Sequence, residues 1–140
     1  YWNCAWNISQ PPHTLGILCD PAHPALAGFP TESHTNWQWW DLIHGSAAMV
    51  LDGLPKNLRP IVQPIDDYQF NRRLGLVFEA SVNGGRVLVC SADLRTNMEQ
   101  RPVARQFLRS LSAYMESDRF DPTVELTPQS IKRVIGRGNW

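Results

Sequence analysis

The clearest structural signal in this sequence is a pair of apolar segments joined by a short polar turn. Residues 74–82 read LGLVFEASV, residues 86–91 read RVLVCS, and Asn-Gly-Gly at 83–85 separates them. Asn and Gly tolerate the positive φ angles of a tight turn, so the pattern predicts a β-hairpin. The second segment is apolar throughout at 87–90, which predicts a strand buried on both faces.

Two helices are expected after the hairpin. Apolar residues at three- and four-residue steps predict an amphipathic helix over 102–115, with Pro in its first turn. Thr127 followed by Pro128 is typical of a helix start, and the apolar stripe after it predicts a last helix. On the polar side of the first of these helices we expect a solvated row of three arginines: Arg101, Arg105 and Arg109.

Shorter elements are expected before the hairpin. The segment TLGILC at 14–19 predicts a short strand that Pro21 ends, and a helical turn fits residues 24–27. Residues 49–51 are apolar and lead into a turn. The segment RPIVQPIDD at 59–67 resembles a strand whose two prolines place it at a sheet edge or make it irregular.

These elements predict an α/β domain with a mixed sheet, a β-hairpin and flanking helices. The length of 140 residues suits one domain, with an α/β core at 1–116 and a C-terminal helical extension at 117–140. The strands are few for a complete doubly wound sheet, and the chain opens on Tyr1 without an initiator Met. We therefore expect it to be a fragment of a larger multidomain protein.

Composition excludes some classes of function. The net charge of +0 argues against non-specific nucleic-acid binding, which requires a basic face. The absence of a run of about 18 apolar residues argues against a membrane span. Cys4, Cys19 and Cys90 are too few and scattered for a disulfide framework, and we interpret them as small buried apolar residues.

The segment SHTNWQWWDLI at 33–43 contains three tryptophans within four residues. Such rings either anchor a core or form a stacking surface, because each presents a large apolar area. Read as a helix opened by Thr35 or Asn36, the segment favours packing under a sheet over binding of a sugar or partner. If a glycan does bind, the expected stacking residues are Trp37, Trp39 and Trp40, and the expected hydroxyl partners are His34, Asn36, Gln38 and Asp41.

No strong catalytic or metal motif is present. The four histidines lack ligand spacing, so we predict no metal site: His13, His23, His34 and His44. We predict no cofactor either, because Gly84 and Gly85 fit a hairpin turn and have no phosphate-loop context. Four carboxylates lie at strand ends or within strands, and capping of turns or pairing with arginines is their simplest role: Asp66, Asp67, Glu79 and Asp93. The obvious partners are Arg72, Arg73 and Arg101.

Several segments together resemble a known family. They are HTLGILCDPAHPALAGFPTESHTNWQWWDLI, LDGLPKNLRPIVQPIDD, NRRLGLVFEASVNGGRVLVCSADL and RPVARQFLRSLSAYM. They resemble the C-terminal region of large exported bacterial glycoside hydrolases of the family 2, β-galactosidase-like type, which carries the same HP…GFPT…WQWW pattern. That region in turn resembles a class I glutamine-amidotransferase-like, flavodoxin-like domain. The resemblance runs from Trp2 to about Tyr114 and implies a partial or compact domain of that fold.

The resemblance implies a non-catalytic accessory domain in carbohydrate breakdown. The catalytic glutamates of such hydrolases lie in a separate barrel domain, which no segment here matches. Amidotransferases use a Cys on a glycine-flanked elbow and a late His-x-Glu dyad, whereas Cys4 lacks those glycines and no His follows His44. The implied partners are other domains of the same parent chain and an oligosaccharide, and the implied location is periplasmic or secreted.

Two alternatives stay open, and whether the chain is an enzyme is left undecided. The first is a small hydrolase that works through Cys4 or Cys90 with His34. The second is an oligomerisation module, because related flavodoxin-like domains in other β-galactosidases resemble trimer-forming modules. A homo-oligomer is therefore an expected assembly under the second alternative.

Overall fold

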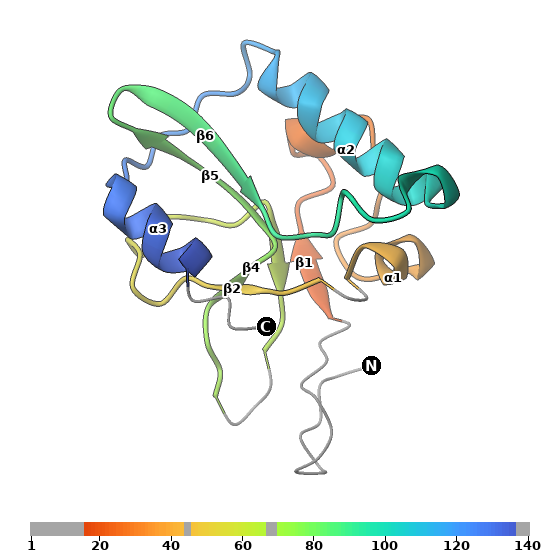
Figure 1. Cartoon of the computed structure of the whole chain (residues 1–140), viewed down its shortest axis with the longest axis horizontal. Helices are drawn as coiled ribbons and strands as arrows, with labels where there is room; N and C mark the ends of the chain where they lie inside the picture. Colours follow the sequence, from red (N-terminus) through yellow and green to blue (C-terminus); the bar gives the residue numbers. More distant parts are fainter. Residues whose placement is uncertain (1–15, 44–45, 67–69, 137–140) are drawn as a thin grey trace.

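The computed structural model describes residues 16–43, 46–66 and 70–136 (Figure 1). Strands and helices are combined in one α/β arrangement, which confirms the predicted class. A four-stranded sheet has the order β1-β3-β5-β6, and a two-stranded sheet pairs β2 with β4. The strands are β1 Ile17–Cys19, β2 Met49–Val50, β3 Val62–Pro64, β4 Leu74–Gly75, β5 Val77–Val82 and β6 Gly85–Cys90.

All pairings between these named strands are antiparallel. Parallel pairing occurs in the described part of the chain at the isolated bridge between Ser81 and Glu125. The predicted mixed sheet is therefore corrected to two antiparallel sheets with one parallel bridge. That bridge is held by the N–H of Ser81, which donates to the carbonyl of Val124 at 2.9 Å, and by the N–H of Leu126, which donates to the carbonyl of Ser81 at 2.8 Å.

The predicted hairpin is confirmed as β5 and β6. Val82 pairs with Gly85, and the two residues between them have positive φ, 50° at Asn83 and 78° at Gly84. β6 is the outer strand of the sheet, so full burial on both faces was wrong, and residues 87–90 are half-buried. Its apolar side chains still divide between two cores, one on each face of the sheet.

Of the two alternatives for residues 59–67, the sheet-edge placement was wrong and the irregular strand is confirmed. β3 lies between β1 and β5, although it pairs with β5 only at Val62 and Val77. Pro64 stands opposite Ile17, and the next hydrogen bond to β1 runs from the N–H of Ile65 to the carbonyl of Gly16 at 2.9 Å. The ladder to β1 therefore continues past Pro64 without using an N–H at that position.

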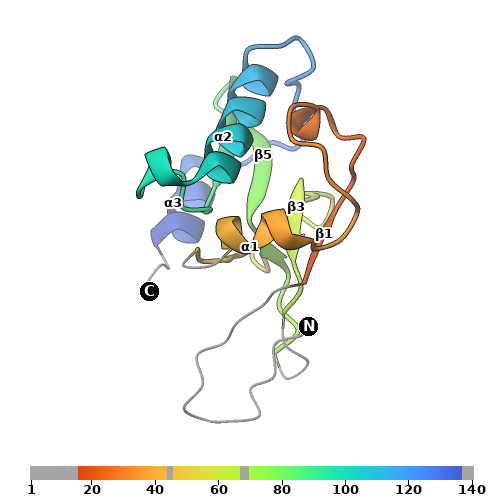
Figure 2. The same cartoon turned by 90° about the vertical axis from the view of Figure 1, so that its right-hand side faces the viewer.

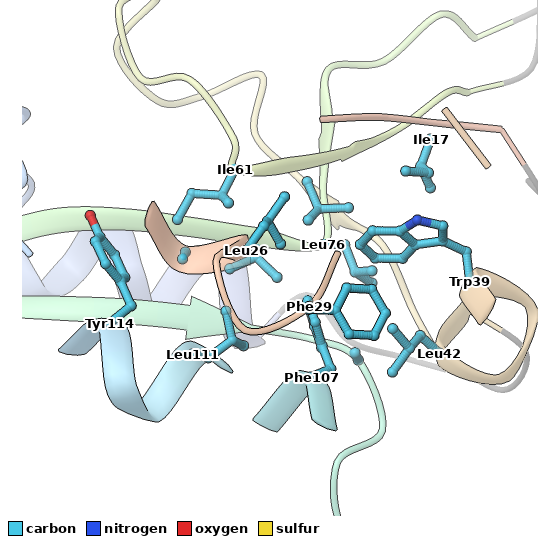
Figure 3. Close-up of a cluster of buried hydrophobic side chains, with 14 of the residues drawn as sticks. Ile17, Leu26, Phe29, Trp39, Leu42, Ile61, Leu76, Phe107, Leu111 and Tyr114 are labelled. Carbon is cyan, nitrogen blue, oxygen red and sulfur yellow. The ribbon is translucent and has the colours of Figure 1, made fainter. Parts of the chain in front are cut away.

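One face of the larger sheet is covered by α1 (Trp37–Ile43), α2 (Pro102–Met115) and the short 3-10 helix η1 (Pro24–Leu26). Three rings meet edge to face at the centre of this core (Figure 3). Phe29 lies 5.2 Å from Trp39 and 5.0 Å from Phe107, measured between ring centroids. The helix predicted over 102–115 is confirmed, and its buried residues fill the same core.

The opposite side carries α3 (Pro128–Gly136) and the smaller sheet, and the β5–β6 hairpin lies between α2 and α3 (Figure 1). The predicted helix start is confirmed, because Thr127 Oγ1 accepts a hydrogen bond from the N–H of Ser130 at 3.1 Å. Leu126 and Val134 are buried here against Phe78. Of the helices in the described ranges, none has the length and apolarity to cross a membrane.

Candidate functional site

The three tryptophans of α1 divide between core and surface. Trp39 is fully buried, at 0% exposure, and its indole N–H donates to Thr31 Oγ1 at 2.8 Å. Trp37 is 89% exposed and Trp40 is 46% exposed. Residues three and four apart share one side of a helix, so Trp37, Trp40 and Asp41 lie on the outer side of α1. Trp39 is therefore corrected to a core residue, whereas Trp37 and Trp40 are exposed at the surface.

An open hollow of about 260 Å³ lies beside Trp40. Its wall comes from α1, from the loop after β6 and from the residue before α2, which meet where α1 lies near the start of α2 (Figure 2). The lining residues are Trp40, Asp41, Asp93, Thr96 and Arg101. The hollow thus combines one indole ring with two carboxylates, one hydroxyl and one guanidinium group.

Arg101 holds the three segments of this wall together. Its Nε lies 3.0 Å and 3.2 Å from the two carboxylate oxygens of Asp41, and its Nη2 donates to the Asp41 carbonyl at 2.8 Å. Its Nη1 donates to the carbonyls of Asp93 and Thr96 at 2.7 Å and 3.2 Å. The Arg101 side chain is only 14% exposed, so its expected place on a solvated face was wrong.

The expected pairing of Asp93 with an arginine is confirmed, since Nη1 of Arg101 lies 3.4 Å from Asp93 Oδ2. The other oxygen, Oδ1, accepts from the N–H groups of Thr96 and Arg95 at 3.0 Å and 3.1 Å. These backbone hydrogen bonds, chiefly that of Thr96, lower the pKa of Asp93 below its usual value. Asp93 therefore carries its negative charge at neutral pH, in a loop whose shape its own side chain fixes.

Residues 1–136 match the sequence model of the family described as Domain of unknown function (DUF8487). The chain belongs to this family. No curated protein matches the chain. The matched range includes α1, the loop after β6 and α2, so the whole hollow belongs to the DUF8487 domain.

Two other predicted contact residues of the DUF8487 domain, Asn36 and Gln38, shape the start of α1. Asn36 Oδ1 accepts from the N–H of Gln38 at 3.2 Å, and Gln38 Nε2 donates to the Pro30 carbonyl at 2.8 Å. His34 is exposed, with Nε2 3.4 Å from Glu32 Oε2. Within the described part of the chain, two of the seven residues predicted to contact a glycan line the hollow, Trp40 and Asp41.

Sequence reasoning missed three members of the hollow as site residues: Asp93, Thr96 and Arg101. Asp93 followed by a Thr three residues later is typical of a side chain that accepts from backbone N–H groups in a loop, and this signal could have placed Asp93 and Thr96 in one turn. Nothing local connects Arg101 to Asp41, because their contact spans 60 positions.

Two of the carboxylates singled out in the sequence, Asp66 and Glu79, lie outside the hollow and make contacts of their own. Arg72 binds Asp66 through Nε at 2.7 Å and Nη2 at 3.0 Å, which confirms one expected ion pair. Glu79 Oε2 accepts from the hydroxyl of Tyr114 at 2.6 Å. No set of three or more metal-ligating side chains converges within the described residues. Four residues that the sequence analysis considered as a nucleophile, metal ligands or a paired carboxylate lie outside the described residues: Cys4, His13, His44 and Asp67.

The described cysteines have unreactive surroundings. Burial raises the pKa of the Cys90 thiol to about 11. Burial also raises the pKa of Cys19, whose Sγ donates to the Glu32 carbonyl at 3.2 Å. A thiol nucleophile requires the opposite shift, toward the thiolate, so neither site favours nucleophilic catalysis.

Proposed function

We propose that this DUF8487 domain is a non-catalytic accessory domain of an exported, β-galactosidase-like glycoside hydrolase, and that it contacts carbohydrate through the hollow at Trp40. The observation that carries the proposal is a half-exposed indole beside a fixed polar wall. The segment resemblance to such hydrolases supports the same class of ligand.

The chemistry of a sugar matches both parts of the hollow. A pyranose ring has an apolar face, which stacks on indole, and a rim of hydroxyls that require hydrogen-bond partners. The Asp41 and Asp93 side chains are 35% and 32% exposed, so their carboxylates accept from ligand hydroxyls while Arg101 holds them in place. A wall ordered before binding loses little conformational entropy when the ligand arrives.

The proposal extends to fold and partners. A compact flavodoxin-like, amidotransferase-like domain is supported by helices on both sides of the sheet, whereas the antiparallel pairing departs from the parallel sheet of that fold. The partners in this account are the neighbouring domains of an exported parent chain, in the periplasm or outside the cell. An experimental structure of the intact parent, superposed on amidotransferase domains, tests the fold and the neighbours together.

A scaffold or oligomerisation role is the second candidate, and the exposed apolar side chains favour it. Trp37 stands out from α1, and Leu18 on β1 is 52% exposed. Large apolar groups with this exposure are common at protein interfaces. Light scattering after size exclusion measures the assembly state of the wild type and of a Leu18→Ser, Trp37→Ser variant. A higher oligomer that dissociates in the variant supports this role.

Isothermal titration calorimetry against a panel of plant and host oligosaccharides tests the carbohydrate proposal. We expect saturable binding that Trp40→Ala weakens by about tenfold or more, because a central aromatic carries much of the binding energy. Ile135→Ala is the matched control, since Ile135 is exposed on α3, on the other side of the sheet. Equal binding by the wild type and Trp40→Ala would contradict the site, and no binding to any glycan would contradict the function.

A further inference from the structure

We infer that the hollow at Trp40 selects uncharged oligosaccharides and rejects acidic ones such as uronates. This inference rests on the proposed function, which it narrows from carbohydrate in general to neutral carbohydrate. It follows from how the charges of the hollow are already paired.

The guanidinium group of Arg101 is already committed to the protein. Proteins usually grip a ligand carboxylate with two parallel N–H donors of one arginine. Here Nε and Nη2 both bind Asp41, and Nη1 binds the carbonyls of Asp93 and Thr96. Each of the three nitrogens has a protein acceptor, so a bidentate grip on a ligand carboxylate would require Arg101 to release α1 or the loop after β6.

The remaining charge in the hollow is negative. Arg101 is the cation among the described lining residues, and it faces two carboxylates, Asp41 and Asp93. Arg105, one turn further along α2, turns its Nη1 to the carbonyls of Met98 and Glu99 at 2.5 Å and 2.6 Å. One unbalanced negative charge therefore faces any ligand in the hollow.

A carboxylate on the sugar would meet this charge at short range. Two like charges a few ångströms apart repel strongly enough at a partly desolvated surface to change affinity by about tenfold. An uncharged hydroxyl at the same position instead donates a hydrogen bond to Asp41 or Asp93. The hollow therefore discriminates through repulsion of the acid as well as through attraction of the neutral sugar.

The test compares matched ligands in the same calorimeter. The probes are hexaoses of β-1,4-linked glucose, mannose and galactose, together with the same chains oxidised at C6 to uronates. We expect at least one neutral hexaose to bind and its oxidised form to bind about tenfold or more weakly at low salt. The difference should shrink as salt is raised, because salt screens repulsion between exposed charges.

Asp93→Asn tests the cause, because it removes the charge and keeps the oxygen that accepts from the loop N–H groups. We expect the preference for the neutral sugar to fall several-fold in this variant. Asp118→Asn makes the same charge change beyond the other end of α2 and should leave the preference unchanged.

The outcomes separate the two claims. Equal or tighter binding of the oxidised form overturns the charge selectivity and leaves the carbohydrate function standing. A preference that Asp93→Asn does not alter also overturns the selectivity. Failure of both series to bind overturns the proposed function and the selectivity with it.

Discussion

Nε of Arg101 lies 3.0 Å from Oδ1 of Asp41, and this contact joins α1 to the residue just before α2, 60 positions further along the sequence. The same guanidinium binds the loop after β6 through the Asp93 and Thr96 carbonyls. One side chain therefore fixes the wall of the hollow and the packing of α1 on α2.

Replacement of Arg101 by Ala should destabilise the fold by roughly 2–4 kcal/mol, because it removes several charge-assisted hydrogen bonds and leaves two carboxylates without their cation. Urea unfolding monitored by circular dichroism gives the value. Arg109→Ala is the control, since Arg109 is exposed on α2, and it should change stability by less than about 0.5 kcal/mol. An equal effect of both substitutions would contradict the role given to Arg101.

Trp39→Ala should cost about 3–5 kcal/mol, because it leaves a cavity beside the Phe29 and Phe107 rings and removes the hydrogen bond to Thr31. Trp37→Ala, two residues away, should change stability by less than about 0.5 kcal/mol, since Trp37 is exposed. Thermal unfolding of the two variants compares them directly. A large loss of stability in Trp37→Ala would show that α1 is packed differently.

Gly84→Ala should cost about 1–2 kcal/mol, because Gly84 has φ of 78° and a Cβ disfavours that region. A Cβ at Gly84 meets no heavy atom within 4 Å, so the expected effect is conformational and not a clash. A Cβ at Gly136, at the end of α3, also meets no heavy atom within 4 Å, and Gly136 does not have a left-handed φ. Gly136→Ala should therefore leave the stability nearly unchanged. Equal stability of the two variants in urea would exclude a strained turn.

Cys90 should react slowly with iodoacetamide at pH 8 in the folded protein. Its folded-state pKa of about 11 lies above the ordinary thiol value, so the protonated form is favoured in the fold. The stability linked to this group is fully present below the unfolded pKa, near 8.5, and is lost as pH rises toward about 11. Peptide mapping after timed labelling measures the rate, with urea-unfolded protein as reference. Equal rates in the two states would contradict the burial.

The sequence alone correctly predicted the elements that are determined by residues close together in the chain. The hairpin follows from Asn83 and Gly84, and α2 follows from its apolar spacing after Pro102. The tryptophans show the limit of local reasoning. Helical spacing separates Trp39 from Trp37 and Trp40, but it does not say which side of α1 faces the sheet.

The sequence patterns did not predict the features that depend on contacts between residues far apart in the chain. The two prolines near β3 are typical of an edge strand, yet β3 lies between β1 and β5. The sheet tolerates these prolines because the ladder from β3 to β5 is a single pair. Arg101 looked solvated because it shares spacing with Arg105 and Arg109, and only the fold brings Asp41 and the loop after β6 against it. Polar contacts over long sequence separations leave no periodic signal.

The most direct test of the carbohydrate site is a two-dimensional NMR titration of the indole N–H signals, assigned by Trp→Phe variants, with a glycan that binds in calorimetry. If a glycan binds at the hollow, the Trp40 signal shifts saturably, while the signal of Trp39, which is buried and hydrogen-bonded to Thr31, stays in place. A titration in which Trp40 does not move, or moves only together with Trp39, would contradict binding at this hollow.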